Sequence, residues 1–313
     1  MRVLIAGASG AIGVRLVPQL IEDGHDVIGT SRSERNAERL RALGAEAVAL
    51  DLLDPGAVRR VVSETRPDAI VHQATALADA GFTRRLDRGF AQTNRLRVEG
   101  TDALLAAARE AGVQRFVGQS FAPYRYARVG GPVKTEDDPL EQAPPASARQ
   151  TFAAMSHLEE AVTGAGGIAL RYGGFYGAAN DGLAGPVRKR LYPVIGDGGG
   201  VFSFTHLDDA AAATALALEG GRPGVYNITD DEPAPVRDWL PVLAEALGAG
   251  PPRHVPRWLA RLIMGEGLVM MTEGRGASNA KAKAELGWTL RYPSWRQGFA
   301  AAYGRPERVK ADA

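Results

Sequence analysis

Three glycines recur at every third position near the N-terminus. They stand in Gly7-Ala8-Ser9-Gly10-Ala11-Ile12-Gly13, which follows a predicted strand at residues 3–6 and opens a predicted helix. Glycine permits a tight turn that brings backbone N–H groups close to a pyrophosphate, and the last glycine lets helix and strand pack closely. The segment therefore predicts a dinucleotide site, with contacts from Gly7, Ser9, Gly10, Ala11, Ile12 and Gly13.

The end of the second predicted strand, residues 27–29, bears on the choice of cofactor. The chain continues as Thr30-Ser31-Arg32-Ser33, without the carboxylate that binds the adenosine ribose of NAD. Ser31 and Arg32 can bind a 2′-phosphate, and guanidinium–phosphate pairing is charge-assisted. We therefore expect NADP rather than NAD. The alternative is that Arg32 is one more solvated arginine.

The composition of the chain argues against several kinds of partner and binding site. The 313 residues carry 37 basic and 36 acidic side chains, a net charge of +1, and no cysteine. This balance argues against a nucleic-acid partner, and the lack of cysteine excludes disulfides and thiolate metal sites. The five histidines show no metal-ligand spacing, so no metal is expected. Because no apolar run reaches membrane-spanning length, we expect a cytoplasmic protein without a membrane partner.

Short apolar runs alternate with amphipathic stretches through the first half of the chain. Strands are expected at residues 3–6, 27–29, 47–50, 69–74, 115–120, 168–172 and 225–228, and long helices at 93–111 and 152–162. This alternation predicts an α/β fold with a doubly wound parallel sheet.

The pattern changes after residue 177. We expect a dinucleotide-binding Rossmann domain at 1–177 plus about 206–230. A small, mainly helical substrate lobe should take about 178–205 plus 231–303, followed by a flexible tail at 304–313.

Several segments, taken in order, resemble the extended branch of the short-chain dehydrogenase/reductase superfamily, which includes the NAD-dependent epimerase/dehydratase family. They are the glycine run, Asp51-Leu52, the segment 72–76, the segment 170–177, the segment 204–209 and the segment 285–288. The resemblance implies a doubly wound fold, a homodimer built on the two long helices, and further cofactor contacts from Asp51, Leu52, Gln73, Ala74, Thr75, Tyr172 and Gly173.

The chain departs from that family where the family places its acid–base chemistry. The resemblance implies a Tyr-x-x-x-Lys pair, in which tyrosine transfers a proton and lysine holds the ribose. No lysine here has a tyrosine four residues before it, and the equivalent positions are Thr151 and Met155. Phe202 stands where nucleotide-sugar members carry an arginine, so a UDP-sugar substrate is not expected.

The loop after the fifth strand offers replacement proton donors. It contains Ser120, Tyr124 and Tyr126, and ligands in open α/β sheets bind at such strand ends. Arg125 and Lys134 could lower the pKa of a tyrosine there. The alternatives are that the tyrosines anchor the loop and that Lys134 is a surface residue. Tyr172 and Tyr176 are reserve candidates.

Our leading hypothesis is an NADP-dependent oxidoreductase, a ketone or enone reductase acting on an apolar small metabolite. Hydride chemistry belongs to the cofactor, while the protein orients it and supplies a proton. Two alternatives stay open: a non-redox cyclase, lyase or isomerase on the same fold, and a non-catalytic NADP-binding sensor or scaffold.

Overall fold

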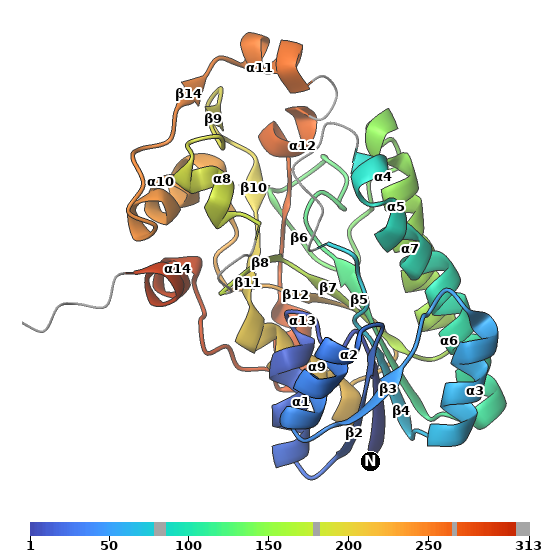
Figure 1. Ribbon diagram of the computed structural model, residues 1–313. Helices are drawn as coiled ribbons and strands as arrows, with labels where there is room; N and C mark the ends of the chain where they lie inside the picture. Colours follow the sequence, from blue (N-terminus) through green and yellow to red (C-terminus); the bar gives the residue numbers. More distant parts are fainter. Residues whose placement is uncertain (78–85, 178–181, 265–267, 305–313) are drawn as a thin grey trace, which may run out of the picture.

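A seven-stranded parallel sheet forms the centre of the computed structural model, which describes residues 1–77, 86–177, 182–264 and 268–304 (Figure 1). The strand order is β12-β7-β5-β4-β1-β2-β3. The strands are β1 (Arg2–Ala6), β2 (Asp26–Ser31), β3 (Glu46–Ala49), β4 (Ala69–His72), β5 (Arg115–Phe121), β7 (Ile168–Tyr172) and β12 (Gly224–Ile228). The expected α/β Rossmann fold is confirmed.

The central strands are apolar along their whole length because helices cover both faces of the sheet. Val3 to Ala6 of β1 have no exposed surface, and Ile5 pairs with Gly29 of β2 on one side and Val71 of β4 on the other. Continuous apolar runs of this kind are typical of buried parallel strands. The strand order reverses between β1 and β4, and ligands bind at the carboxyl ends of the strands beside such a reversal.

Helices cover each face of the sheet. One face packs against α1 (Gly13–Glu22), α2 (Glu34–Ala42), α9 (Leu207–Glu219) and α13 (Ala280–Leu286). The other packs against α3 (Pro55–Thr65), α6 (Thr101–Ala111) and α7 (Arg149–Gly164). Side-chain caps start three of these helices: Ser33 Oγ accepts from Asn36 N at 3.4 Å, Asp54 accepts from Ala57 N at 3.0 Å, and His206 Nδ1 accepts from Asp208 N at 3.1 Å.

The long helix expected at residues 93–111 contains a local change in winding. It runs through α5 (Ala91–Arg95), a π-helical turn (Leu96–Gly100) and α6. A π-helical turn holds more residues than an α-helical one, so it shifts the side chains after it around the helix axis. A short helix, α4 (Leu86–Gly89), precedes this segment.

A third apolar cluster lies mainly among elements after residue 176 and includes Phe204, Trp239, Trp295 and Phe299. Its region holds β8 (Gly174–Tyr176), α8 (Ala184–Arg188), β9 (Val194–Ile195), β10 (Val201–Phe202), β11 (Phe204–His206), β13 (Ala234–Pro235), α10 (Val236–Ala246), β14 (His254–Val255), α11 (Arg257–Met264), α12 (Leu268–Thr272) and α14 (Trp295–Tyr303). A two-stranded pair, β6 (Val133–Lys134) with β15 (Gly276–Ala277), joins the loop after β5 to this region.

The chain returns to the sheet within the stretch expected to form the lobe. Helix α13 packs on β12 and α9, and Leu286 and Trp288 belong to the apolar cluster of the sheet. Residues 305–313 of the expected tail lie outside the described residues. Within the described part of the chain, no helix is long and apolar enough to cross a membrane, and no three His, Asp or Glu side chains gather as a metal site.

Candidate cofactor and active site

The glycine turn between β1 and α1 has the geometry that close approach requires. Gly7 has a φ of +91°, and a methyl group placed on it would lie 2.7 Å from the backbone nitrogen of Ala74. A methyl group on Gly13 would lie 2.3 Å from the carbonyl oxygen of Ala8. Both glycines are therefore required by backbone packing, which brings the loop after β4 against the turn.

The N-terminus of α1 suits a negatively charged group. Its first turn contains no acidic residue, and no side chain caps it. Gly10 and Ala11 are exposed, Ser9 is half-buried and the Ile12 side chain is buried. Backbone N–H groups and the positive end of the helix dipole would thus face a bound pyrophosphate. The residues present fit the phosphates of a dinucleotide.

The two residues expected at the 2′-phosphate, at the end of β2, differ in exposure. Ser31 is buried and its hydroxyl donates to Ser33 O at 3.0 Å. Arg32 is exposed and forms no ion pair within the described part of the chain. The neighbouring carboxylate of Glu34 pairs instead with Arg41 at 2.6 Å. The guanidinium of Arg32 is therefore available for an external anion.

The remaining expected cofactor contacts lie at the carboxyl ends of β3, β4 and β7. Asp51 is exposed and Leu52 is buried. Gln73 is buried next to the half-buried Ala74 and Thr75, and its Nε2 donates to the Tyr172 hydroxyl at 2.9 Å. Its Oε1 is buried and has no hydrogen-bond partner within the described ranges, so it could accept from a bound ligand.

Tyr172 and Gly173 belong to the packed interior. The Tyr172 side chain has no exposed surface, and its hydroxyl pairs with Thr214 at 2.7 Å. Burial raises the pKa of Tyr172 to about 12. Gly173 N donates to Thr205 Oγ1 at 2.9 Å. Tyr176 is equally enclosed, and burial raises its pKa as well.

Ser120 takes part in a buried charge cluster that the sequence did not predict. Glu159 of α7 accepts from Ser120 Oγ at 2.5 Å, from Arg171 at 3.0 and 2.7 Å, and from Arg125 at 3.1 Å. Burial alone would raise the pKa of Glu159, but the hydrogen bonds and charges of Arg171 and Arg125 outweigh it and hold the pKa below its ordinary value. The sequence signal that could have indicated this cluster is Arg171, a charged residue within the otherwise apolar predicted strand at 168–172.

Tyr126 is fixed at the edge of the same cluster. Its hydroxyl donates to Asn227 Oδ1 at 2.6 Å and accepts from Arg171 Nη1 at 3.1 Å. Only 2% of its surface is exposed, and burial raises its pKa. The contacts describe a loop anchor.

Tyr124 has a different environment. Its backbone φ is +67°, its ring lies 5.7 Å from that of Phe202, and it lines a small cavity with Phe152 and Val269. Burial raises its pKa to about 12, although a hydrogen bond with Tyr192 acts in the opposite direction. The expected lowering by Arg125 or Lys134 is not seen, because Arg125 turns to Glu159 and Lys134 pairs with Asp138 at 3.0 Å.

The start of α7 holds Thr151 at the position where the resemblance places a tyrosine. Asp87 Oδ1 accepts from both the backbone nitrogen and the hydroxyl of Thr151 at 2.8 Å, and Asn94 Nδ2 donates to that hydroxyl at 3.1 Å. Met155, one turn on, is buried in apolar contacts. The Asp87 carboxylate, which also accepts from Gln150 N at 3.1 Å, thus caps the start of α7, and the Thr151 hydroxyl is held between Asp87 and Asn94.

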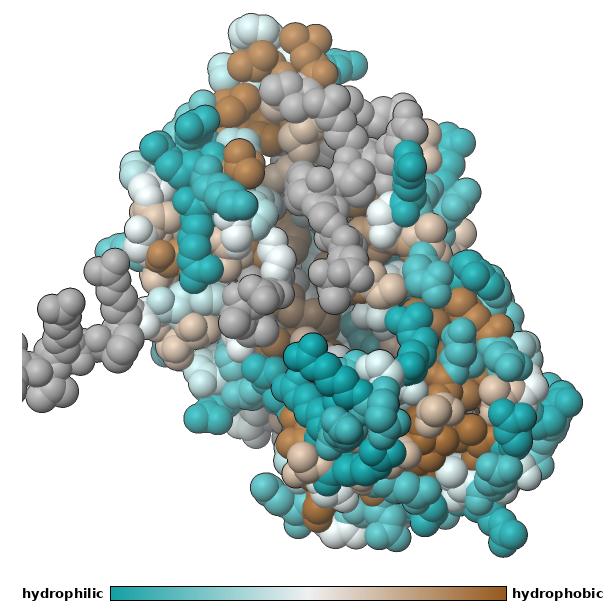
Figure 2. All heavy atoms as spheres, viewed as in Figure 1, coloured by the Kyte–Doolittle hydropathy of each residue, from teal (hydrophilic) through white to brown (hydrophobic). Residues whose placement is uncertain are grey.

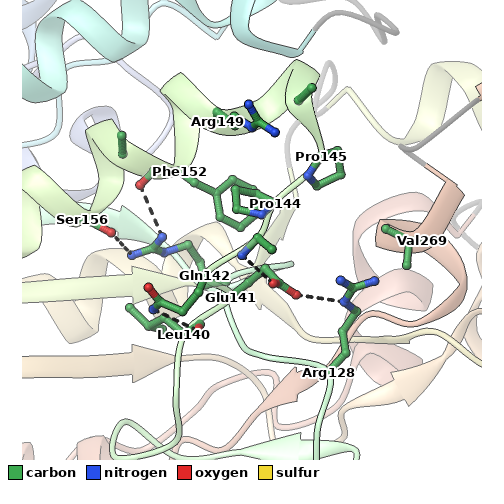
Figure 3. A pocket seen from close by; sticks show the side chains of 14 residues that line it. Arg128, Leu140, Glu141, Gln142, Pro144, Pro145, Arg149, Phe152, Ser156 and Val269 are labelled. Carbon is green, nitrogen blue, oxygen red and sulfur yellow. Dashed lines mark hydrogen bonds and ion pairs between the residues drawn. The ribbon is translucent and has the colours of Figure 1, made fainter.

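A larger cavity of about 840 Å³ opens beside α7 (Figure 3). Its walls include Phe152, Pro144 and Pro145, and Arg128 crosses it to pair with Glu141 at 2.8 Å. It shares Phe152 and Val269 with the smaller cavity next to Tyr124. The mixture of apolar walls and arginines suits a small organic molecule with a polar end.

Comparison with known proteins agrees with this geometry. The model of the NAD dependent epimerase/dehydratase family matches residues 3–229. A 3-diazoavenalumate denitrifying reductase from a Streptomyces species is 44% identical, over 96% of this chain and 99% of its own. A 2-alkyl-3-oxoalkanoate reductase from Stenotrophomonas maltophilia is 31% identical, over 80% of this chain and 76% of its own.

The fold also has solved counterparts. The UDP-glucose 4-epimerase of Thermotoga maritima superposes with a TM-score of 0.76, covers 97% of both chains and is 24% identical. The chain therefore belongs to the NAD dependent epimerase/dehydratase family, in the extended short-chain dehydrogenase/reductase branch, and is an NAD(P)-dependent reductase of that family.

Proposed function

We propose that the protein is an NADPH-dependent reductase whose hydride acceptor is the arenediazonium group of a small molecule. The observation that carries the proposal is the start of α7, where the Thr151 hydroxyl donates to Asp87 and accepts from Asn94. In addition, the sequence contains no Tyr-x-x-x-Lys pair. A reaction that needs no proton from the protein is consistent with this arrangement.

The chemistry balances without a general acid. NADPH, when bound, supplies a hydride. A carbon bearing a diazonium group gains that hydride and loses N2, so the C–N bond is replaced by a C–H bond and no alkoxide is formed. A ketone that accepts a hydride becomes an alkoxide instead, and it needs a proton in or soon after the transition state.

The protein contributes binding and orientation. The turn Gly7–Gly13 would hold the pyrophosphate, Arg32 the 2′-phosphate, and the segment after β4 would lie along the cofactor. The cavities next to Tyr124 and Phe152 would take the substrate. The Streptomyces relative, named for denitrifying reduction of a diazo compound, supports this choice of acceptor.

A second candidate is reduction of a ketone or enone on an apolar small metabolite. Tyr124 favours it, since it is a phenol beside Phe202 in the smaller cavity, and the Stenotrophomonas relative is named for a 3-oxo substrate. A phenol whose pKa is raised to about 12 still donates a proton to an alkoxide, which is a stronger base.

The deciding experiment compares the two acceptor classes under the same conditions. Purified protein is given NADPH with an arene diazonium carboxylate or with a panel of ketones and enones, and NADPH absorbance and N2 release are followed. We expect one NADPH oxidised for each N2 released. Turnover of ketones or enones alone would establish the second candidate. Binding of NADPH without turnover of either acceptor class would favour the non-redox enzyme or the NADP-binding sensor instead.

We further propose a homodimer built on α6 and α7. Figure 2 shows apolar residues at the surface over α3 and α6, which is consistent with a buried partner surface there. Light scattering should report twice the 33.1 kDa of one chain. A mass of one chain at working concentration would contradict the dimer.

A further inference from the structure

Arg97 is a buried cation that has no hydrogen-bond or ion-pair partner among the residues that the structure describes. It lies in the π-helical turn Leu96–Gly100, and only 4% of its surface is exposed. Its Nε and Nη1 are enclosed, and neither has a hydrogen-bond acceptor among the described residues. Burial and the charge of Arg125 lower the pKa of Arg97 to about 10, against the opposing effect of Glu159, so the guanidinium stays charged at neutral pH.

The fold places Arg97 at the carboxyl edge of the sheet. His72, the last residue of β4, contacts the carbonyl oxygen of Leu96 through Nε2 at 3.2 Å. One helical turn earlier, Asn94 binds Thr151 at the start of α7. Arg97 is therefore held between the end of β4 and helix α7, beyond the strand-order reversal at β1 and β4.

The charges around Arg97 do not balance within the protein. Three guanidiniums, those of Arg97, Arg125 and Arg171, lie near the one carboxylate of Glu159. The two oxygens of Glu159 are already occupied by Arg171, Arg125 and Ser120. Buried donors are almost always paired in a working protein, so a bound ligand is the natural acceptor for Arg97.

We propose that Arg97 holds the nicotinamide ribose of bound NADPH, with Nη2, the guanidinium nitrogen that is not among the two enclosed ones, donating to the ribose hydroxyls; this rests on the proposed function. A dinucleotide whose pyrophosphate lies at the N-terminus of α1 extends its second half past β4, toward β5. The ribose has two adjacent hydroxyl oxygens, and the planar guanidinium presents neighbouring N–H groups that match such a pair. Met155 offers no hydrogen-bond donor there, so Arg97 supplies the cation.

Three ligands of graded length test the contact by titration calorimetry. NADPH and 2′-phospho-ADP-ribose both contain the second ribose, whereas 2′,5′-ADP lacks it. We expect Arg97→Gln to weaken binding of the first two by about tenfold or more, the scale of a charge-assisted hydrogen bond, and to leave 2′,5′-ADP binding unchanged. Arg95→Gln is the matched control, because Arg95 is exposed on the same helical segment and pairs with Glu99.

Thermal unfolding supplies a readout that a structural role would not give. Because the described part of the chain gives Arg97 no hydrogen-bond partner, Arg97→Gln should leave the Tm of the apoprotein unchanged or raise it, and should reduce the shift that NADPH causes. If Arg97→Gln does not fold, Arg97→Lys decides: the shorter lysine side chain lacks the planar guanidinium, so binding of NADPH and 2′-phospho-ADP-ribose should still weaken severalfold, while 2′,5′-ADP binding should not change.

Two results would overturn the contact. One is unchanged NADPH affinity in the folded variant, and the other is an equal loss for all three ligands, which would make Arg97 structural. Failure of the proposed function is separate from both, since it would appear as wild-type protein that does not reduce the diazonium substrate, whatever its affinity for the three ligands.

Discussion

Replacing Glu159 by glutamine should strongly destabilise the protein. The carboxylate is 4% exposed and accepts four hydrogen bonds from Ser120, Arg125 and Arg171. Glutamine keeps the shape but removes the charge, and one end of its amide is a donor that would face donors. Removal of one partner from a buried ion pair typically costs about 3–5 kcal/mol, because the remaining charge is left uncompensated.

The assay is urea denaturation of the apoprotein followed by circular dichroism, comparing Glu159→Gln with wild type. Glu160→Gln is the matched control, because Glu160 is the next residue of α7 and its side chain is exposed. The control should change the free energy of unfolding by no more than about 0.5 kcal/mol. A loss at Glu159 as small as that of the control would refute the reasoning that this carboxylate compensates the buried arginines.

Three further predictions concern the cofactor, the proton source and acidity. Arg32→Ala should weaken NADPH binding by about tenfold and leave NADH binding unchanged in calorimetry; this is the lower end of the range for a charge-assisted contact, because the side chain is exposed. Equal losses of affinity for both cofactors would contradict the assignment of Arg32 to the 2′-phosphate. Tyr124→Phe should lower kcat for a ketone by about 10²–10⁴-fold and leave kcat for the diazonium substrate unaffected. If the substitution changes neither kcat, this phenol is excluded as the acid. Because the pKa of Glu159 is held below its unfolded value of about 4.3, its contribution is present above that pH and is lost as pH falls through the lowered pKa. The stability difference between wild type and Glu159→Gln should therefore shrink in acid, and a difference that grows would contradict the sign.

Local sequence signals predicted the Rossmann fold and its glycine turn well. The turn Gly7–Gly13 depends on neighbouring residues only, and the strands were visible as short apolar runs. The register of the sheet and the reversal at β1 then follow from the general rules of parallel α/β folds.

The chemistry around α7 could not be predicted in the same way. Glu159, Arg125 and Arg171 are far apart in the sequence, and their pairing depends on how β5, β7 and α7 pack. Arg125 was expected beside a tyrosine, yet its guanidinium has a stronger partner in the buried carboxylate. Arg97 gave no sequence signal, because an arginine in a helix of a chain with so many arginines suggests only a solvated side chain.

The arginine cluster also constrains how this protein can change during evolution. A lysine at position 155 would stand one helical turn from Glu159 and add a fourth cation to a region where one carboxylate already faces three guanidiniums. Such a change would add electrostatic repulsion to the cluster, and that repulsion would be smaller in a chain whose residue 97 is uncharged. The uncharged Met155, buried in apolar contacts, adds no such repulsion.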